Sequence, residues 1–235
     1  MKKDKLSKRL EKVSHFIKEG AIVADIGSDH AYLPVYLADT GKSPFVIAGD
    51  VNEGPLSSAQ DQITKHNLKD KIKAKLGSGL SVLEGESVDT VVIAGMGGPL
   101  IASILDNDKE QLEGVNRLVL QPNVASDHVR KWLFDNGWNL VDEAILEEDD
   151  HVYEIAVAEK GNARQNYSSM LEKELWMGPF LLKNKNSAFE KKWKRELAQL
   201  EKIDKQLATA ADRPGLKDKK QEIRLKIKWL KEELA

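Results

Sequence analysis

The stretch that decides the fold class is Ala24-Asp25-Ile26-Gly27-Ser28-Asp29-His30-Ala31-Tyr32-Leu33-Pro34, residues 24–34. An apolar run over residues 21–26 predicts a buried strand, Gly27 predicts a tight turn, and a helix is expected through about residue 39. A strand that passes through a glycine turn into a helix is typical of the nucleotide-binding end of a Rossmann-like sheet. The stretch therefore predicts an α/β protein with a ligand at this turn.

Strands and helices alternate along the chain to about residue 160. Further strands are predicted at residues 45–51, 71–76, 88–94, 117–121, 139–147 and 152–158. Helices are predicted at residues 4–18, 55–66, 99–105 and 126–136, the last capped by Ser126. Apolar strands separated by helices indicate a mostly parallel sheet, and the last two strands indicate an antiparallel hairpin. The prediction is a seven-stranded Rossmann-like sheet that binds ligands at the carboxyl ends of its strands.

The pattern changes after Gly161, which divides the chain into an α/β domain (residues 1–160) and a helical arm (residues 161–235). Apolar residues at helical spacing predict one helix over residues 189–207 and another over residues 216–230. Arg213-Pro214-Gly215 breaks the pattern between them. The arm is therefore expected to be an antiparallel helical hairpin that resembles a coiled coil.

Composition excludes several classes of protein. The chain has 235 residues and no cysteine, so it has no disulfide framework, no thiolate metal site and no cysteine nucleophile. No His, Asp or Glu cluster has metal-ligand spacing, so no metal is expected. The amino terminus lacks a secretory signal, and the longest uncharged run, residues 90–105, is interrupted by glycines and too short to span a membrane. We expect a cytoplasmic protein with no membrane partner.

The formal net charge of −2 conceals two opposite halves. Residues 1–160 carry a net charge of −9, whereas the arm carries +7. Six basic residues cluster around Trp193: Lys183, Lys185, Lys191, Lys192, Lys194 and Arg195. A basic helix can follow nucleic-acid phosphates, although a solvated helical face has a similar composition. The contrast with the acidic half favours RNA contact by the arm.

The turn at Gly27 does not match the three-glycine fingerprint of a dinucleotide site. Asp29 stands where the second glycine would be, and its carboxylate would repel a pyrophosphate. Asp25 and Asp29 suit a cationic ligand instead, and S-adenosyl-L-methionine carries a sulfonium and an ammonium but no phosphate. Asp50 lies 23 residues after Gly27, where a carboxylate commonly holds a ribose diol. Each aspartate could alternatively be a simple helix cap.

Three further segments follow predicted strands and could complete a site. Gly77-Ser78-Gly79 could lie along an adenine ring, or it could be only a flexible turn. Ala94-Gly95-Met96-Gly97-Gly98 would border both the cofactor and a target base, because its glycines permit close backbone approach. Asn123 could form hydrogen bonds to a base edge. His151 and Tyr153 open the last strand, where Tyr153 could stack on a base or be an ordinary strand residue.

Four motifs together resemble the bacterial tRNA adenine-N1 methyltransferases that act on adenine 22 of the D-arm. These motifs are Asp-Ile-Gly-Ser-Asp-His-Ala-Tyr-Leu-Pro at 25–34, Ala-Gly-Met-Gly-Gly at 94–98, Leu-Gln-Pro-Asn at 120–123 and His-Val-Tyr-Glu-Ile at 151–155. The resemblance covers nearly the whole chain, including the helical tail. It implies methyl transfer from S-adenosyl-L-methionine to N1 of adenine 22 in tRNA, with S-adenosylhomocysteine as the product. We expect no DNA partner, and a monomer is favoured although the sequence does not fix the oligomeric state.

The resemblance also implies roles for individual residues. Gly27, Ser28 and Asp29 would hold the methionyl part of the cofactor, together with Asp25. Asp50 and Val51 would hold the ribose and the adenine edge, and Gly77, Ser78 and Gly79 would line the adenine. Ala94, Gly95 and Met96 would form the floor. Independently of the resemblance, its carboxylate charge makes Asp29 the candidate for stabilising the cationic product, with His30 and Tyr32 shaping the pocket and Asn123 at the edge of the target base.

Two other classes of function remain as alternatives. A methyltransferase of the same fold could act on another RNA, a protein or a small molecule, although a small-molecule enzyme would not need a basic arm. A non-catalytic RNA-binding module with a vestigial Rossmann domain is disfavoured by the intact Gly27, Asp29 and Asp50.

Overall fold

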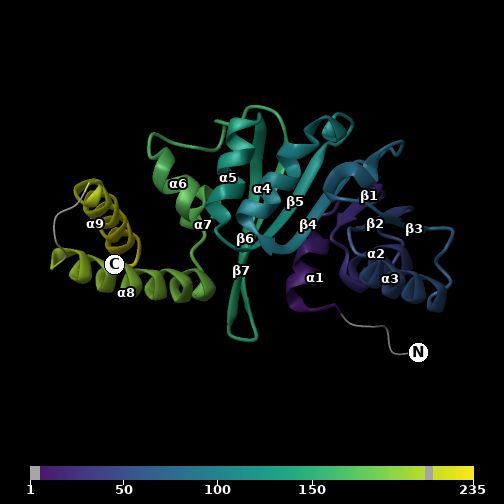
Figure 1. The fold of residues 1–235 in the computed structure, drawn as a ribbon, viewed down its shortest axis with the longest axis horizontal. Coiled ribbons are helices and arrows are strands. Elements are labelled where there is room, and N and C mark those ends of the chain that lie inside the picture. The colour runs from purple at the N-terminus through teal and green to yellow at the C-terminus, as the bar shows by residue number, and fades with distance from the viewer. Residues whose placement is uncertain (1–5, 210–213) are drawn as a thin grey trace.

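The computed structural model describes residues 6–209 and 214–235, and its centre is one seven-stranded sheet (Figure 1). The strands lie in the order β3-β2-β1-β4-β5-β7-β6. Their bounds are β1 (Val23–Ile26), β2 (Val46–Asp50), β3 (Ile72–Leu76), β4 (Thr90–Gly97), β5 (Arg117–Val124), β6 (Trp138–Glu148) and β7 (His151–Lys160). Strands β1 to β5 are parallel, and β7 is antiparallel to both β5 and β6. The predicted Rossmann-like sheet with a closing hairpin is confirmed.

Helices cover both faces of the sheet, because the central strands are apolar on both sides. One face packs against α1 (Lys8–His15), α2 (Tyr32–Asp39) and α3 (Glu53–Lys65). The other packs against the 3-10 helices η2 (Gly79–Leu83) and η3 (Lys109–Leu112) and against α4 (Gly98–Asn107) and α5 (Ser126–Asp135). Consecutive β4 residues such as Val91 and Val92 are fully buried on opposite faces. This two-sided burial is what a parallel sheet requires.

Several predicted boundaries were wrong. Strand β4 continues through a bulge to Gly97, and β5 continues to Val124, because Met96 pairs with Pro122 and Gly97 pairs with Val124. Ser126 is the first helical residue of α5 rather than its cap, a position taken by Ala125 with φ of 54°. The backbone of Ala125 packs directly against Gly98, because a Cβ at position 98 would overlap the Ala125 carbonyl oxygen.

The first helix and the motif turn also differ from expectation. Helix α1 begins at Lys8, where the Ser7 side chain accepts the Leu10 amide hydrogen, and it ends at His15. Residues 4 and 5 of the predicted helix lie outside the described residues. A 3-10 turn, η1 (Asp29–Ala31), precedes α2, and His30 and Ala31 both have positive φ. Such backbone conformations are uncommon for residues other than glycine and concentrate at functional sites.

The arm contains the predicted pair of long helices, α8 (Ser187–Ala208) and α9 (Leu216–Glu233). Ion pairs join Asp204 to Arg224 and Glu201 to Lys231, so the two helices run in opposite directions. Arg213, part of the predicted break, lies outside the described residues. Two short helices that the pattern did not predict, α6 (Leu171–Met177) and α7 (Pro179–Lys183), connect the sheet to this hairpin.

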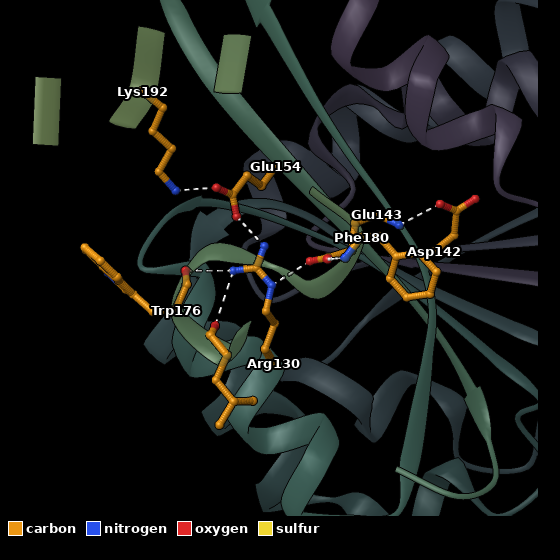
Figure 2. Close-up of polar contacts among 8 residues, drawn as sticks. Arg130, Asp142, Glu143, Glu154, Trp176, Phe180 and Lys192 are labelled. Carbon is orange, nitrogen blue, oxygen red and sulfur yellow. Dashed lines mark hydrogen bonds and ion pairs between the residues drawn. The ribbon is translucent and has the colours of Figure 1, made fainter. Parts of the chain in front are cut away.

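A buried charge network joins the arm to the sheet (Figure 2). Arg130 on α5 is 1% exposed and donates hydrogen bonds to Glu143 (2.5 Å) on β6 and to Glu154 (2.6 Å) on β7. Its Nη1 donates to the carbonyl oxygens of Trp176 (3.2 Å) and Leu175 (3.4 Å) on α6. Glu154 also accepts a hydrogen bond from Lys192 on α8. One guanidinium therefore connects the sheet, α6 and, through Glu154, the long helix of the arm.

Candidate active site

A cleft of about 530 Å³ opens at the carboxyl ends of β1, β2, β4 and β5. Twelve of the residues predicted from the sequence line it: Gly27, Asp29, Asp50, Val51, Gly77, Ser78, Gly79, Ala94, Gly95, Met96, Asn123 and Tyr153. A second cavity of about 330 Å³ adjoins it and is lined by Asp25 and Tyr32, and the two cavities share Gly27, Asp29 and Ala94. The segments at the carboxyl ends of β1 to β5 therefore meet in one site.

Five residues that the sequence offered as site residues do not line either cavity: Ser28, His30, Gly97, Gly98 and His151. The Ser28 side chain is buried, and its backbone N–H donates to the Gly49 carbonyl oxygen at 2.9 Å, so this residue shapes the turn. His30 lies beside Asp29, with its Nε2 3.3 Å from the Asp29 carboxylate. Its ring contacts the Tyr32 ring at 5.6 Å between centroids.

The glycine turn brings the backbone close to the floor of the cleft. Gly27 has φ of 74°, and its N–H donates to the Gly49 carbonyl oxygen at 2.8 Å. A Cβ at Gly27 would overlap the end of the Met96 side chain, which lies across the turn. The positive φ favours glycine here, whereas a Cβ would displace only the flexible end of the Met96 side chain.

Asp50 stands at the end of β2 with one carboxylate oxygen already engaged. Its Oδ1 accepts the backbone N–H of Asn52 at 2.8 Å, which fixes the carboxylate over the cleft. The other oxygen makes no hydrogen bond to any of the described residues. A preoriented carboxylate with a remaining acceptor suits a ligand hydroxyl pair.

Two amides from β5 hold the loop at Gly95. Gln121 is fully buried, and its Oε1 accepts the Gly95 N–H at 3.0 Å. Asn123 donates from Nδ2 to the Gly95 carbonyl oxygen at 2.7 Å and accepts from Gln121 at 3.1 Å. Asn123 therefore orients the loop, in addition to lining the cleft as the sequence predicted.

Arg9 is the site residue that sequence reasoning missed. It lies on α1, 112 residues from its partner Gln121, whose Oε1 accepts a hydrogen bond from the guanidinium. The guanidinium also lies over the Tyr153 ring, 5.4 Å from its centroid, and lines both cavities. The only available signal was a basic residue on a helix with an apolar stripe, and such residues are common on solvent-exposed faces.

Asp25 is the most strongly perturbed carboxyl of this site. Burial raises its pKa to about 6, while the Ser28 hydroxyl and the positive charge of Arg9 lower it by less. The side chain is 7% exposed and lines the second cavity. A desolvated carboxylate beside a guanidinium matches the ammonium and the carboxylate of an amino-acid group. The site therefore fits the methionyl end of S-adenosyl-L-methionine.

The basic cluster of the arm is largely engaged within the protein. Lys185, Lys191, Lys192 and Lys194 form ion pairs, Arg195 donates to the Asp150 carbonyl oxygen, and Lys183 lies over the Phe180 ring. Within the part of the chain that the structure describes, four other arm lysines make no hydrogen bond or ion pair: Lys202, Lys205, Lys217 and Lys220. These four belong to the ends of α8 and α9 that lie farthest from the sheet (Figure 1).

The described residues offer neither a metal-ion site nor a membrane-spanning helix. No group of three or more His, Cys, Asp or Glu residues in these parts of the chain could hold a metal ion. None of the helices described is sufficiently long and apolar to span a bilayer.

Comparison with known proteins gives consistent matches over the whole chain. The family model described as tRNA (adenine(22)-N(1))-methyltransferase, TrmK, matches residues 23–232. The chain is 45% identical to the tRNA (adenine(22)-N(1))-methyltransferase of Bacillus subtilis, over 97% of this chain and 96% of that protein. The crystal structure of the B. subtilis m1A22 tRNA methyltransferase TrmK superposes with a TM-score of 0.93, covering 98% of this chain and 99% of that one. A Streptococcus pneumoniae protein solved in complex with S-adenosyl-L-methionine is 41% identical, with a TM-score of 0.86 and coverage of 98% and 100%.

Proposed function

Since the chain belongs to the TrmK family of tRNA (adenine(22)-N(1))-methyltransferases, we propose that it transfers a methyl group from S-adenosyl-L-methionine to N1 of adenine 22 in tRNA. The observation that carries the proposal is the convergence of three glycine loops with Asp29 and Asp50 on one cleft. This set supplies close backbone approach and carboxylates, which suit a cationic nucleoside. Transfer of a labelled methyl group to unmodified tRNA tests the proposal, and no incorporation into any tRNA would reject it.

The residues of the cleft divide into contacts for three parts of the cofactor. Asp50 accepts hydrogen bonds from the ribose hydroxyls, while Val51 and the segment 77–79 border the adenine. Gly27, Asp29 and Asp25 hold the methionyl end, with Ser28 shaping the turn and Arg9 facing the carboxylate. Ala94, Gly95 and Met96 form the floor. When bound, S-adenosyl-L-methionine supplies a methyl group on a sulfonium, an electrophile that needs no metal.

The target adenine needs no general base, because N1 has a free lone pair. As the N1–methyl bond forms and the sulfur–methyl bond breaks, the positive charge moves from sulfur to the adenine ring. The protein therefore contributes position and electrostatic stabilisation. Asp29 faces both cavities and stabilises the cationic product, His30 positions Asp29, and Tyr32 and Asn123 border the base. Since the Watson–Crick edge is normally paired, the base must be exposed or flipped out.

Asp29 gives the first test of these roles. The Asp29→Asn variant keeps the size of the side chain but removes the charge that offsets the cationic product. We expect turnover to fall about 10- to 100-fold, in line with the loss of a single electrostatic contact to a transition state. Turnover and cofactor affinity are measured separately. Full turnover with unchanged affinity would remove Asp29 from the mechanism.

Asp25 gives a pH-dependent test. Its pKa in the folded protein, about 6, lies above its usual value of 3.8, so its contribution to stability is greatest below pH 3.8 and is lost as pH rises through 6. We expect Asp25→Asn to stabilise the cofactor-free protein by about 1–3 kcal/mol at pH 8 and by about half as much at pH 5, midway between the two pKa values. The same variant should bind S-adenosyl-L-methionine more weakly, because the ammonium loses its counter-charge.

The measurements are thermal unfolding at both pH values and calorimetric titration of the cofactor. Asp39→Asn, at an exposed position of α2, is the matched control and should change neither quantity. An Asp25→Asn protein that is less stable than the wild type at pH 8, or that binds the cofactor equally well, contradicts the assignment.

We further propose that residues 1–160 form the catalytic domain and that residues 161–235 form an RNA-contacting arm. The support is the net charge of +7 on the arm and the four lysines at its distal end that make no hydrogen bond or ion pair to the residues that the structure describes. An RNA phosphate can bind these lysines without first breaking an ion pair. A monomer in the cytoplasm, where tRNA is available, is part of the same proposal.

The distal lysines can be tested by the salt dependence of tRNA binding. Replacing Lys202, Lys205 and Lys217 together with glutamine should weaken binding about 10- to 100-fold near physiological salt. It should also reduce the slope of log K against log salt by about two to three. A control variant with Lys69, Lys71 and Lys109 changed to glutamine removes the same charge from exposed positions of the body. Equal effects of the two variants would show that the arm has no special role.

A further inference from the structure

The free end of the β6–β7 hairpin, residues 145–154, lies between the active site and the arm. Figure 1 shows it projecting beyond the sheet, with α1 on one side and α8 on the other. The two-residue turn at its end, Asp149 and Asp150, has positive φ at both positions. Turns of this kind match the natural twist of paired strands and give a compact hairpin. The element is therefore a defined two-stranded projection and not a loose loop.

One face of this hairpin end supports the active site. Tyr153 and its cross-strand partner Leu146 face the layer of α1. Tyr153 lines the cleft and lies beneath the Arg9 guanidinium. Glu148 accepts the backbone N–H groups of Lys8 (2.6 Å) and Arg9 (3.1 Å) at the start of α1. The position of Arg9 in the site is thus set by the hairpin as well as by Gln121.

The opposite face of the hairpin end is held by the arm. Because side chains alternate along a strand, Glu154 points away from the face of Tyr153. Glu154 accepts a hydrogen bond from Lys192 of α8, and Figure 2 shows it between Lys192 and Arg130. Burial alone would raise the pKa of Glu154, which is 3% exposed, but the positive charges and hydrogen bonds of Lys192 and Arg130 lower this pKa to about 2.

Further contacts from the arm reach the turn itself. Lys191 binds Glu147 and also Asp150 at 3.2 Å, and the Asn186 side chain donates to the Ile145 carbonyl oxygen at 3.0 Å. Ile145 and Val152 pack with the apolar core of the arm. The hairpin end is therefore held by α1 on the face of the active site and by the arm on the opposite face.

We propose that the hairpin end is a positioning element for methyl transfer, and that Lys192 is a positioning residue that acts through Glu154 and the adjacent Tyr153. The inference depends on the proposed function, in which the arm holds tRNA and the cleft holds the cofactor. The hairpin end fixes the position of the arm relative to Arg9 and Tyr153, which form one wall of the cleft. A misplacement of about 1 Å can reduce a reaction rate by about 100-fold without weakening binding.

The test compares two charge-equivalent variants of the arm. Lys192→Met removes the ion pair with Glu154, and Glu154 then keeps Arg130 as its partner. Lys231→Met, the control, removes the ion pair between Lys231 and Glu201 (2.8 Å), which lies within the arm and does not touch the hairpin. Each variant is assayed as full-length protein, with kcat and KM for tRNA measured at saturating S-adenosyl-L-methionine and the cofactor Kd measured separately.

We expect Lys192→Met to lower kcat about 5- to 10-fold, with a KM for tRNA equal to that of the control and an unchanged cofactor Kd. Lys192→Arg, which can still reach Glu154, should restore kcat. Lys191→Met should lower kcat in the same direction but less, since it loosens the turn only; it also serves as the second variant should Lys192→Met fold poorly. Thermal unfolding of each variant sets an assay temperature well below its Tm.

Two negative results have different meanings. Equal kcat values for Lys192→Met and Lys231→Met, with transfer by the wild type intact, overturn the positioning role and leave the proposed function standing. No transfer by the wild type to any tRNA rejects the proposed function itself. Loss of cofactor affinity in Lys192→Met would also overturn the inference, because the hairpin would then act on the cofactor and not on the placement of tRNA.

Discussion

Replacing Arg130 with methionine is expected to lower the free energy of unfolding by about 3–5 kcal/mol at pH 7. The reason is that Glu143 and Glu154 are buried on either side of the guanidinium. In the variant each buried carboxylate would lose its ion pair with Arg130. Gly178, with φ of 91°, also packs against this network, and a Cβ there would lie 2.7 Å from the guanidinium. The neighbouring Lys131→Met variant removes only an exposed ion pair on α5 and should cost less than about 1 kcal/mol.

The pH dependence separates loss of charge pairing from simple loss of packing. In the wild type the pKa of Glu154 is about 2, below its usual 4.5, so its stabilising contribution is present above pH 4.5 and is lost as pH falls towards 2. Burial raises the pKa of Glu143, against the opposing charge of Arg130. Without Arg130 the protonated form of Glu143 is favoured further, so the deficit of the variant should shrink between pH 7 and pH 5. Urea unfolding that shows the same deficit at both pH values, or a deficit below about 1 kcal/mol, contradicts this account.

Replacing Asp50 with alanine is expected to weaken the binding of S-adenosyl-L-methionine about 100-fold. A hydrogen bond to a charged group contributes about 1.5–3 kcal/mol, and about 2.7 kcal/mol corresponds to 100-fold in Kd. Asp50→Asn keeps one acceptor oxygen, so its affinity for S-adenosyl-L-methionine should fall only about 10-fold. Because Asp50 also accepts the Asn52 N–H, comparing the two variants distinguishes the ligand contact from the support of the loop.

Calorimetric titration measures these affinities, with Asp61→Ala at an exposed position of α3 as the control. The control should bind the cofactor as the wild type does. An Asp50→Ala protein with a Kd within about threefold of the wild type would show that the carboxylate does not hold the ribose.

The sheet and most of the cleft were predictable from sequence because their signals are local. Apolar runs bounded by glycine, such as residues 21–26 before Gly27, specify both a buried strand and the turn that follows it. Parallel strands then place their carboxyl ends together, which brings Asp50 and Asn123 to the same cleft although they are far apart in sequence. Residue type and position at a strand end were enough to identify them.

The features that were missed depend on long-range contacts. Arg9 reaches the site from α1 through Gln121 and Glu148, and neither partner is recognisable from local sequence. Helices α6 and α7 are too short to show helical periodicity, and α6 is held by the donation of Arg130 to the Trp176 carbonyl oxygen. Lys191 and Lys192 were interpreted as part of a basic surface, yet both are paired with acidic residues of the hairpin. Net charge alone cannot distinguish a paired lysine from one available to RNA.

Mapping the modified base in tRNA tests methyl transfer to N1 of adenine 22. Full-length protein is incubated with S-adenosyl-L-methionine and an unmodified tRNA transcript, and the methylated nucleotide is located by mass spectrometry. The same transcript with guanine at position 22 is the control. We expect one N1-methyladenine at position 22 and no methylation of the control. Methylation at another position, or equal methylation of the control transcript, would contradict it.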